Sequence, residues 1–179
     1  SMWKAYLRNH NYDIRVHAKD TTTIDPFFLP YCVNSIPTHY RDISIAKANN
    51  ILLEEMFENT DVSCVILLSG TCFPVVSYSE LEQSLESNTI SRIGNFTFNR
   101  SNHIHKRSTQ LKDPIIDKHH FKKQQPNCII MRSDYNKIKQ HIPYMIDQFK
   151  NVDTPEEHVL INMFEYYNCS ESLNIFIDS

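Results

Sequence analysis

Glycine is the residue that this sequence lacks most clearly. The chain of 179 residues contains 2 glycines, Gly70 and Gly94. Its turns must therefore rely on Asn, Asp, Ser and Pro, which favour turns for other physical reasons. Gly70 stands out for this reason, because it directly follows an apolar run of strand length.

Long apolar runs are also absent. No segment approaches the roughly 20 apolar residues that a membrane-spanning helix needs, and no signal-peptide pattern is present. We therefore expect the chain as given to be soluble, and the sequence leaves its compartment open.

Positive charge is in short supply as well. The chain carries 18 Lys and Arg against 21 Asp and Glu, which gives a net charge of −3. Binding to nucleic acid regardless of base sequence needs a basic surface. We therefore expect no nucleic-acid partner.

The five cysteines do not form the pattern of a disulfide scaffold, because they are few and irregularly spaced. Cys64 and Cys128 lie within apolar runs and are predicted to be buried thiols. A disulfide among Cys32, Cys72 and Cys169 stays open.

Strand and helix patterns alternate along the chain, which predicts an α/β fold in which helices flank a mixed sheet. Residues 95–127 are polar and without periodicity, and they predict an irregular loop region within one domain that spans residues 1–179. Strands are expected at 12–17, 62–69, 89–93, 128–131 and 173–177, and helices at 44–57, 78–85, 133–149 (with Ser133 as its cap) and 154–167.

Local signals predict how several helices begin or break. Asp42 or Ser44 is the expected N-cap of the helix at 44–57. Ser77 and Glu80 have the spacing of a capping box, in which side chain and backbone bond reciprocally. Pro143 is expected to kink or split the helix in which it lies.

Three blocks of the sequence, in this order, resemble the core-2/I-branching glycosyltransferases. The first is WKAYL at 3–7 with YDIRVHAK at 12–19. The second is the helix at 44–57 followed by VILLSGTCFP at 65–74. The third is CIIMR at 128–132, with its helix and then TPEEH at 154–158.

The resemblance implies a GT-A-type fold and an inverting transfer of a sugar, usually N-acetylglucosamine, from a UDP-sugar to a glycan hydroxyl. It also implies that no metal or other cofactor is needed, and that relatives are anchored in Golgi membranes. The resemblance covers the middle of that fold, and we expect the family's first strand and its C-terminal donor-site segment to be missing from the sequence as given. The expected partners are a glycan acceptor and, where the donor site is complete, a nucleotide sugar.

Glu157 has two competing interpretations. By its motif position it resembles the family's catalytic base, the carboxylate that takes the proton of the attacking hydroxyl. The spacing of Thr154 and Glu157 also fits a capping box, in which the glutamate accepts a bond from the Thr154 backbone N–H. One carboxylate cannot fill both roles at once.

Other residues are predicted to bind substrate. Ser69, Gly70, Thr71 and Cys72 follow an apolar strand, and the ligands of open α/β sheets bind at the carboxyl ends of strands. Gly70 would allow a ligand or backbone to approach closely.

Glu156 joins this set of substrate-binding residues by its motif position, where the family usually has Asp, and Arg107 joins it because it lies in the region where the family has an acceptor-contacting loop. Arg107 has the alternative of being a solvated loop residue, and Glu156 of complementing a helix dipole. Histidines at 103, 105, 119 and 120 lack further evident ligands, so we expect no metal site.

Two readings from other classes remain open. The chain could be an inactive relative that binds a glycan or a protein, because the resemblance omits both ends of the donor site. It could also pair with a second copy through an exposed sheet edge.

Overall fold

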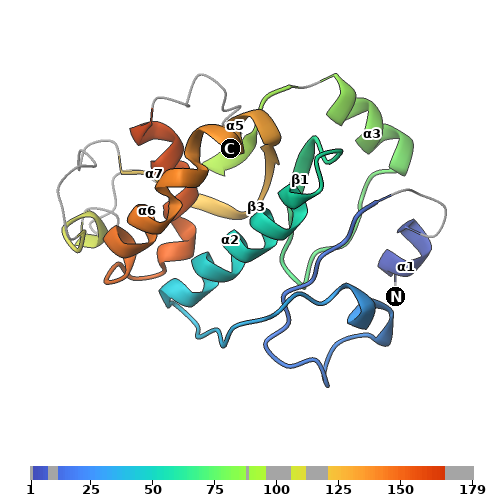
Figure 1. The fold of residues 1–179 in the computed structure, drawn as a ribbon, viewed down its shortest axis with the longest axis horizontal. Helices are drawn as coiled ribbons and strands as arrows, with labels where there is room; N and C mark the ends of the chain where they lie inside the picture. Colours follow the sequence, from blue (N-terminus) through green and yellow to red (C-terminus); the bar gives the residue numbers. More distant parts are fainter. Residues whose placement is uncertain (1, 8–11, 88, 96–105, 112–120, 168–179) are drawn as a thin grey trace.

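A three-stranded sheet with helices packed around it organises the molecule (Figure 1). The computed structural model describes residues 2–7, 12–87, 89–95, 106–111 and 121–167. The strands are β1 (Cys64–Leu67), β2 (Arg92–Asn95) and β3 (Gln124–Met131). Their order in the sheet is β1-β3-β2, and both pairings are antiparallel.

The prediction of a mixed sheet is therefore wrong for the described strands. β1 and β2 run in the same direction, with α3 (Tyr78–Glu86) in the connection between them. They do not pair with each other, because β3 lies between them and runs the opposite way. The connection from β1 to β2 contains a helix, as a crossover between parallel strands does. However, β2 lies one strand away from β1 in the sheet, so the two do not form a parallel pair.

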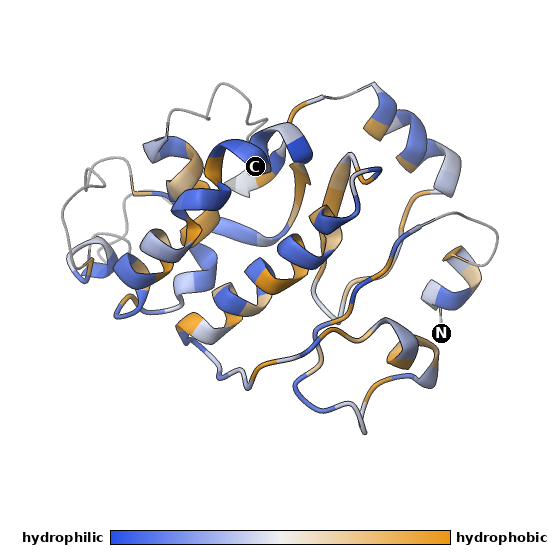
Figure 2. Ribbon diagram, viewed as in Figure 1, coloured by the Kyte–Doolittle hydropathy of each residue, from blue (hydrophilic) through white to orange (hydrophobic). Residues whose placement is uncertain are grey.

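One face of the sheet is buried in the core. Val65 and Leu67 on β1 pair with Ile130 and Cys128 on β3, and all four side chains are buried. Because strand side chains alternate between faces, this register places one apolar row against the helices. The same apolar cluster takes in residues of α2 (Ile43–Glu58), α5 (Arg132–Ile138), α6 (Ile142–Phe149) and α7 (Val159–Tyr166). Figure 2 shows orange residues alternating with blue ones along α2 and α6.

Two predicted caps are confirmed. The Asp42 carboxylate accepts a bond from the Ser44 backbone N–H at 2.8 Å, so Asp42 rather than Ser44 caps α2. At α3, the Ser77 hydroxyl accepts from the Glu80 N–H and the Glu80 carboxylate accepts from the Ser77 N–H at 2.8 Å, a complete capping box.

The predicted helix at 133–149 is split, as Pro143 indicated. α5 ends at Ile138, a 3₁₀ turn η2 (Lys139–His141) follows, and α6 begins with Pro143 in its first turn. Pro lacks an N–H and is tolerated at that place. The expected cap Ser133 is wrong, because Met131 occupies the N-cap of α5 and no side chain bonds there.

Other boundaries differ from the expectation. Residues 12–17 form one isolated bridge, Val16 to Cys32, instead of a strand. β3 begins at Gln124, inside the predicted loop region, and residues 106–108 are helical. The expected strand at 173–177 lies outside the described residues. The remaining elements are α1 (Met2–Leu7), η1 (Pro26–Tyr31) and η3 (Pro155–Glu157).

The described cysteines are free thiols, and Cys169 lies outside the described part. Cys128 is buried as predicted, and burial raises the pKa of its thiol to about 12. Cys64 is only partly buried. Among the described helices, none is both long and apolar enough to cross a membrane.

Arg132, the first residue of α5, connects the start of this helix to the end of α2. Its guanidinium donates to the backbone oxygens of Phe57 at 3.0 Å, of Val62 at 2.6 Å and of Asn59. It also lies 5.0 Å above the Phe57 ring. The last carbonyls of a helix lack partners within the helix, so Arg132 satisfies groups that the turn after α2 leaves open.

We predict that Arg132→Ala lowers the free energy of unfolding by about 2 kcal/mol, because three carbonyls lose a charged donor. Urea unfolding would measure the change. Lys150→Ala serves as control, since the exposed Lys150–Asp147 ion pair should contribute less than about 0.5 kcal/mol. Equal effects of the two substitutions would contradict this account of Arg132.

Candidate active site

Glu157 lies between two cations. Its Oε2 is 3.0 Å from Arg107 Nη1 and 3.2 Å from Lys123 Nζ. Both cations approach the same oxygen, and none of the described residues donates a hydrogen bond to Oε1. The side chain keeps 27% of its surface exposed. One carboxylate oxygen is thus fixed by charge while the other stays open for a proton.

The capping interpretation of Glu157 is wrong. Thr154 adopts a left-handed conformation with φ of 51°, and no side chain caps η3. The Thr154 hydroxyl donates to the Asp153 carbonyl at 2.7 Å, while the Glu157 carboxylate points to Arg107 and Lys123. A capping box needs an extended N-cap residue, which Thr154 is not. The role of Glu157 as a base stays a prediction.

Arg107 connects the acidic residues of the site. Besides Glu157, its guanidinium reaches Asp153 at 3.3 Å. Arg41 binds the same Asp153 carboxylate through Nε at 2.7 Å and through Nη2, and hydrogen bonding from Arg41 holds the pKa of Asp153 below its usual value. Arg107 retains 19% exposure of its side chain, so its interpretation as a solvated loop residue is wrong.

Backbone strain flanks this contact. Arg41, with φ of 61°, and Thr154, with φ of 51°, are the described non-glycine residues with positive φ. Each such conformation costs on the order of 1 kcal/mol or more and persists only where surrounding contacts compensate for it. Here the strained positions are Arg41 itself and the residue after Asp153. The Arg41–Asp153 ion pair is one of the contacts that compensate for this strain.

His158 is the buried member of the network that Arg107 forms with Asp153 and Glu157. Its ring is fully buried, and its Nδ1 lies 2.7 Å from the Lys122 carbonyl. A carbonyl only accepts, so Nδ1 carries the proton and Nε2 accepts from Arg107 Nη1 at 3.3 Å. Burial is the main reason why the pKa of His158 is lowered to about 4. The imidazole is thus neutral at physiological pH and orients Arg107.

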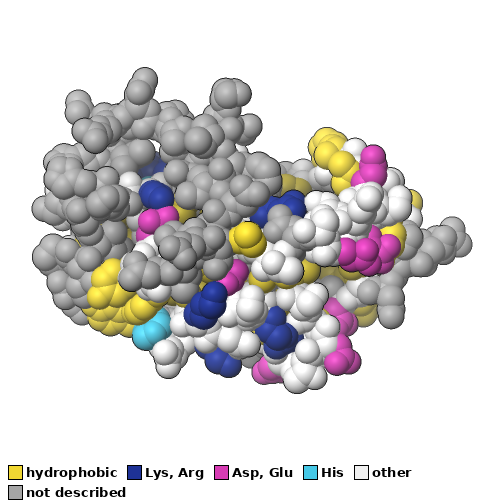
Figure 3. All heavy atoms as spheres, turned by 90° about the horizontal axis from the view of Figure 1, so that it is seen from above, with side chains coloured by type: hydrophobic (Ala, Val, Ile, Leu, Met, Phe, Trp, Pro, Cys, Tyr) yellow, Lys and Arg dark blue, Asp and Glu magenta, His cyan; other side chains and the backbone are white. Residues whose placement is uncertain are grey.

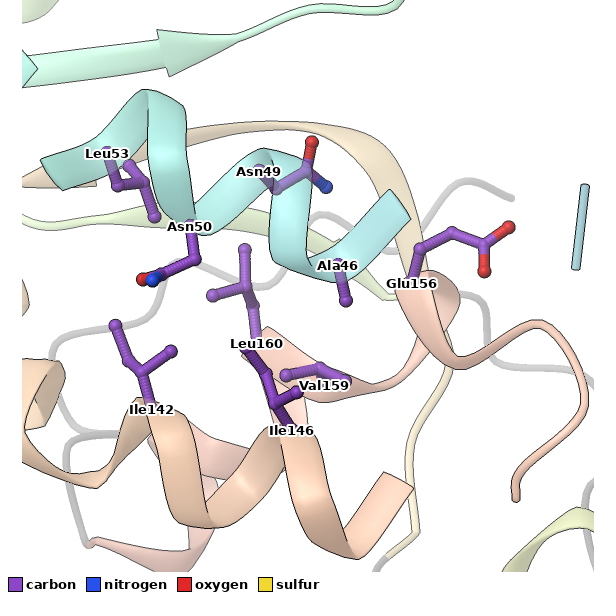
Figure 4. Close-up of a pocket in the computed structure, with 9 residues that line it drawn as sticks. All are labelled: Ala46, Asn49, Asn50, Leu53, Ile142, Ile146, Glu156, Val159 and Leu160. Atoms are coloured by element: carbon purple, nitrogen blue, oxygen red, sulfur yellow. The ribbon is translucent and has the colours of Figure 1, made fainter. Parts of the chain in front are cut away.

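Glu156 lies next to Glu157 in the chain but in different surroundings. Burial raises the pKa of its carboxyl group, and its Oε2 is buried without a partner among the described residues. It borders a small pocket between α2, α6 and α7 (Figure 4), from whose apolar side chains its carboxylate points away. A pocket of about 10 Å³ has room for about one water, so it cannot hold a sugar. Substrate binding by Glu156 stays a prediction.

The 69–72 loop lies apart from the Glu157 region and is held by Asn127 and Trp3. Asn127 Oδ1 accepts from the Ser69 backbone N–H at 3.0 Å and from the Cys72 thiol at 3.3 Å. Trp3 Nε1 donates to the Cys72 carbonyl at 2.9 Å, and the hydroxyls of Ser69 and Thr71 lie 3.0 Å apart. A Cβ on Gly70 would meet no atom within 4 Å, so no close backbone approach requires glycine there. The other glycine, by contrast, packs tightly against a β3 side chain.

The structure brings Arg107 and Glu157 into contact, whereas the Glu156 carboxylate makes no hydrogen bond or ion pair that joins it to these two described residues, and the 69–72 loop lies apart from both. Lys123, which contacts Glu157, immediately precedes β3, and Asn127 lies four residues further along. At the rise of a strand this is about 13 Å. Both places lie toward the same end of the sheet, where β1 ends. Sequence reasoning assigned no role to Arg41, Lys123, Asn127, Asp153 or His158.

Charge elsewhere is mixed. On the face shown in Figure 3, Lys and Arg side chains are scattered among acidic and uncharged ones. Within the described ranges, no group of three or more His, Cys, Asp or Glu could hold a metal ion, and the histidines at 103, 105, 119 and 120 lie outside those ranges. Independence from metal and the absence of a nucleic-acid partner stay predictions.

Comparison with protein families identifies the chain. The family model for Core-2/I-Branching enzymes matches residues 2–153. The chain belongs to this family. The predicted resemblance is thereby confirmed, and with it a relationship to glycosyltransferases of the core-2/I-branching type. The match ends four residues before Glu157. A comparison with curated proteins found no match.

We predict that acidification from about pH 7 to about pH 5 destabilises the protein through His158. The folded-state pKa of His158 is lowered from 6.5 to about 4, so the unfolded chain takes up a proton first. Stability from this group is complete above pH 6.5 and is lost as the pH falls toward 4, by about 2 kcal/mol at about pH 5.

His158→Gln is the matched variant for urea unfolding at both pH values, because Gln stays neutral. The raised pKa of Glu156 acts in the opposite direction, and the difference between wild type and variant removes its contribution. An identical pH dependence of the two proteins would contradict the neutral, buried state of His158.

Proposed function

We propose that this domain transfers a sugar, N-acetylglucosamine being the expected one, from a UDP-sugar to a glycan hydroxyl with inversion and without a metal. Glu157 is the general base. The observation that carries the proposal is the open oxygen of Glu157, whose other oxygen two cations hold in place. Membership of the Core-2/I-Branching family supports the reaction class.

The proposed step needs one carboxylate at the acceptor. Oε1 of Glu157 takes the proton of the acceptor hydroxyl while the hydroxyl oxygen attacks the anomeric carbon. The bond from that carbon to the diphosphate breaks, and the nucleotide diphosphate leaves with the electron pair. Inversion follows because attack and departure take place on opposite faces of the sugar.

Arg107 and Lys123 position the base in this scheme. Arg107 is itself oriented by His158 and Asp153, so its guanidinium fixes the direction of the Glu157 side chain. A geometry held before the substrate arrives contributes to catalysis, since little entropy is left to lose in the reaction. The charge of the leaving diphosphate would be neutralised by Lys or Arg in place of a metal.

A second candidate function is binding of a glycan or protein without catalysis. The full pairing of Glu157 Oε2 favours it, because two cations already neutralise the carboxylate. In that case Glu157 contributes only an ion pair that connects the 106–111 segment to η3.

We predict that Glu157→Gln lowers the rate of sugar transfer by at least about a hundredfold, because the amide cannot take the proton of the acceptor. The measurement is the release of UDP from UDP-N-acetylglucosamine in the presence of glycan acceptors.

Glu165→Gln is the matched control. Glu165 is a carboxylate of similar exposure that pairs with Lys122, and it lies outside the proposed site. Its replacement should leave transfer near the wild-type rate. Transfer by Glu157→Gln at the rate of Glu165→Gln would overturn the role of Glu157 as base, and with it the proposed mechanism.

A further inference from the structure

The orientation of the Asn127 side chain is fixed by its neighbours. The Ser69 backbone N–H can only donate, so the atom 3.0 Å from it must be the amide oxygen Oδ1. The same oxygen also accepts from the Cys72 thiol at 3.3 Å. Both contacts come from the 69–72 loop and use the oxygen alone. The amide nitrogen Nδ2 must therefore point away from these donors.

Nδ2 carries two donor hydrogens, and none of the described residues accepts a bond from it. Asn127 is only partly buried. It lies on the face of β3 opposite to Cys128 and Ile130, which point into the core. A fixed amide group with unused donors at a partly exposed position is suited to bind an oxygen acceptor of a ligand.

The polar groups near Asn127 suit the same nucleotide sugar that is proposed to bind near Glu157. The hydroxyls of Ser69 and Thr71 lie beside the loop end that Asn127 holds. About 13 Å along β3, Lys123 contacts the Glu157 carboxylate. An extended ligand that spans several sugar or phosphate groups could contact both ends of this strand segment.

We propose that Asn127 is a substrate-binding residue whose Nδ2 donates hydrogen bonds to an oxygen of the nucleotide sugar, either a phosphoryl oxygen or a sugar hydroxyl. This inference rests on the proposed function. It assigns Asn127 two separate tasks: Oδ1 positions the 69–72 loop, and Nδ2 binds the ligand.

Asn127→Asp separates the two tasks. A carboxylate still accepts from the Ser69 N–H and the Cys72 thiol, so the loop keeps its anchor, but both donor hydrogens are lost. Asn127→Ala removes the anchor and the donors together. Asn136→Asp, at an exposed position of α5, controls for the added negative charge.

The experiment is calorimetric titration of UDP and of UDP-N-acetylglucosamine into the wild type and the three variants, with thermal unfolding of each. We expect Asn127→Asp to unfold near the wild-type temperature and to bind UDP-N-acetylglucosamine at least about tenfold more weakly. Asn136→Asp should bind as the wild type does. An equal loss for UDP assigns the contact to the diphosphate, and a loss confined to the nucleotide sugar assigns it to the sugar.

Wild-type affinity in Asn127→Asp would overturn the proposal and leave Asn127 as an anchor of the loop, with the proposed function intact. Absence of binding to the wild type would overturn the proposed function itself, and this inference with it. Should Asn127→Asp lack a cooperative unfolding transition, Asn127→Ser replaces it, and unchanged affinity in that variant would equally overturn the proposal.

Discussion

The contact of Arg107 with Glu157 and Asp153 is the interaction on which the arrangement of the candidate site depends. It joins the 106–111 segment to the 153–158 segment, which are distant in sequence. Buried His158 orients the guanidinium from one side, and Arg41 shares Asp153 from the other. Partly buried ion pairs are costly unless their hydrogen bonds are satisfied, and here each charged group has several partners. Arg41 and Thr154, which flank these contacts, both have positive φ values, a strained conformation that persists only where surrounding contacts compensate for it.

A single strand relates the two regions that the sequence singled out. β3 lies in the middle of the sheet and pairs with both other described strands. The residue before it reaches Glu157, and Asn127 within it holds the 69–72 loop. The distance between the base and the loop is consequently set by a rigid element. Such placement on a strand keeps functional groups at fixed separation better than placement on loops does.

Features with a local cause could be predicted from the sequence. The Asp42 cap, the Ser77–Glu80 capping box and the split at Pro143 each depend on a few neighbouring residues, and the apolar runs predicted β1 and β3. The sheet order could not be read in this way, since strand pairing is decided by contacts between distant segments. The spacing of Thr154 and Glu157 suggested that Glu157 belongs to a capping box. Its carboxylate instead forms ion pairs with Arg107 and Lys123, which are distant in sequence. No functional role could be predicted for Asn127, because a single polar residue before a buried strand does not by itself indicate binding.

The most direct test of the account is whether this domain binds a nucleotide sugar without metal. UDP-N-acetylglucosamine would be titrated into the wild-type protein by calorimetry in the presence of a chelator. The account predicts saturable binding in the micromolar range that added magnesium does not change. No detectable heat up to millimolar nucleotide sugar, or binding that requires magnesium, would contradict it.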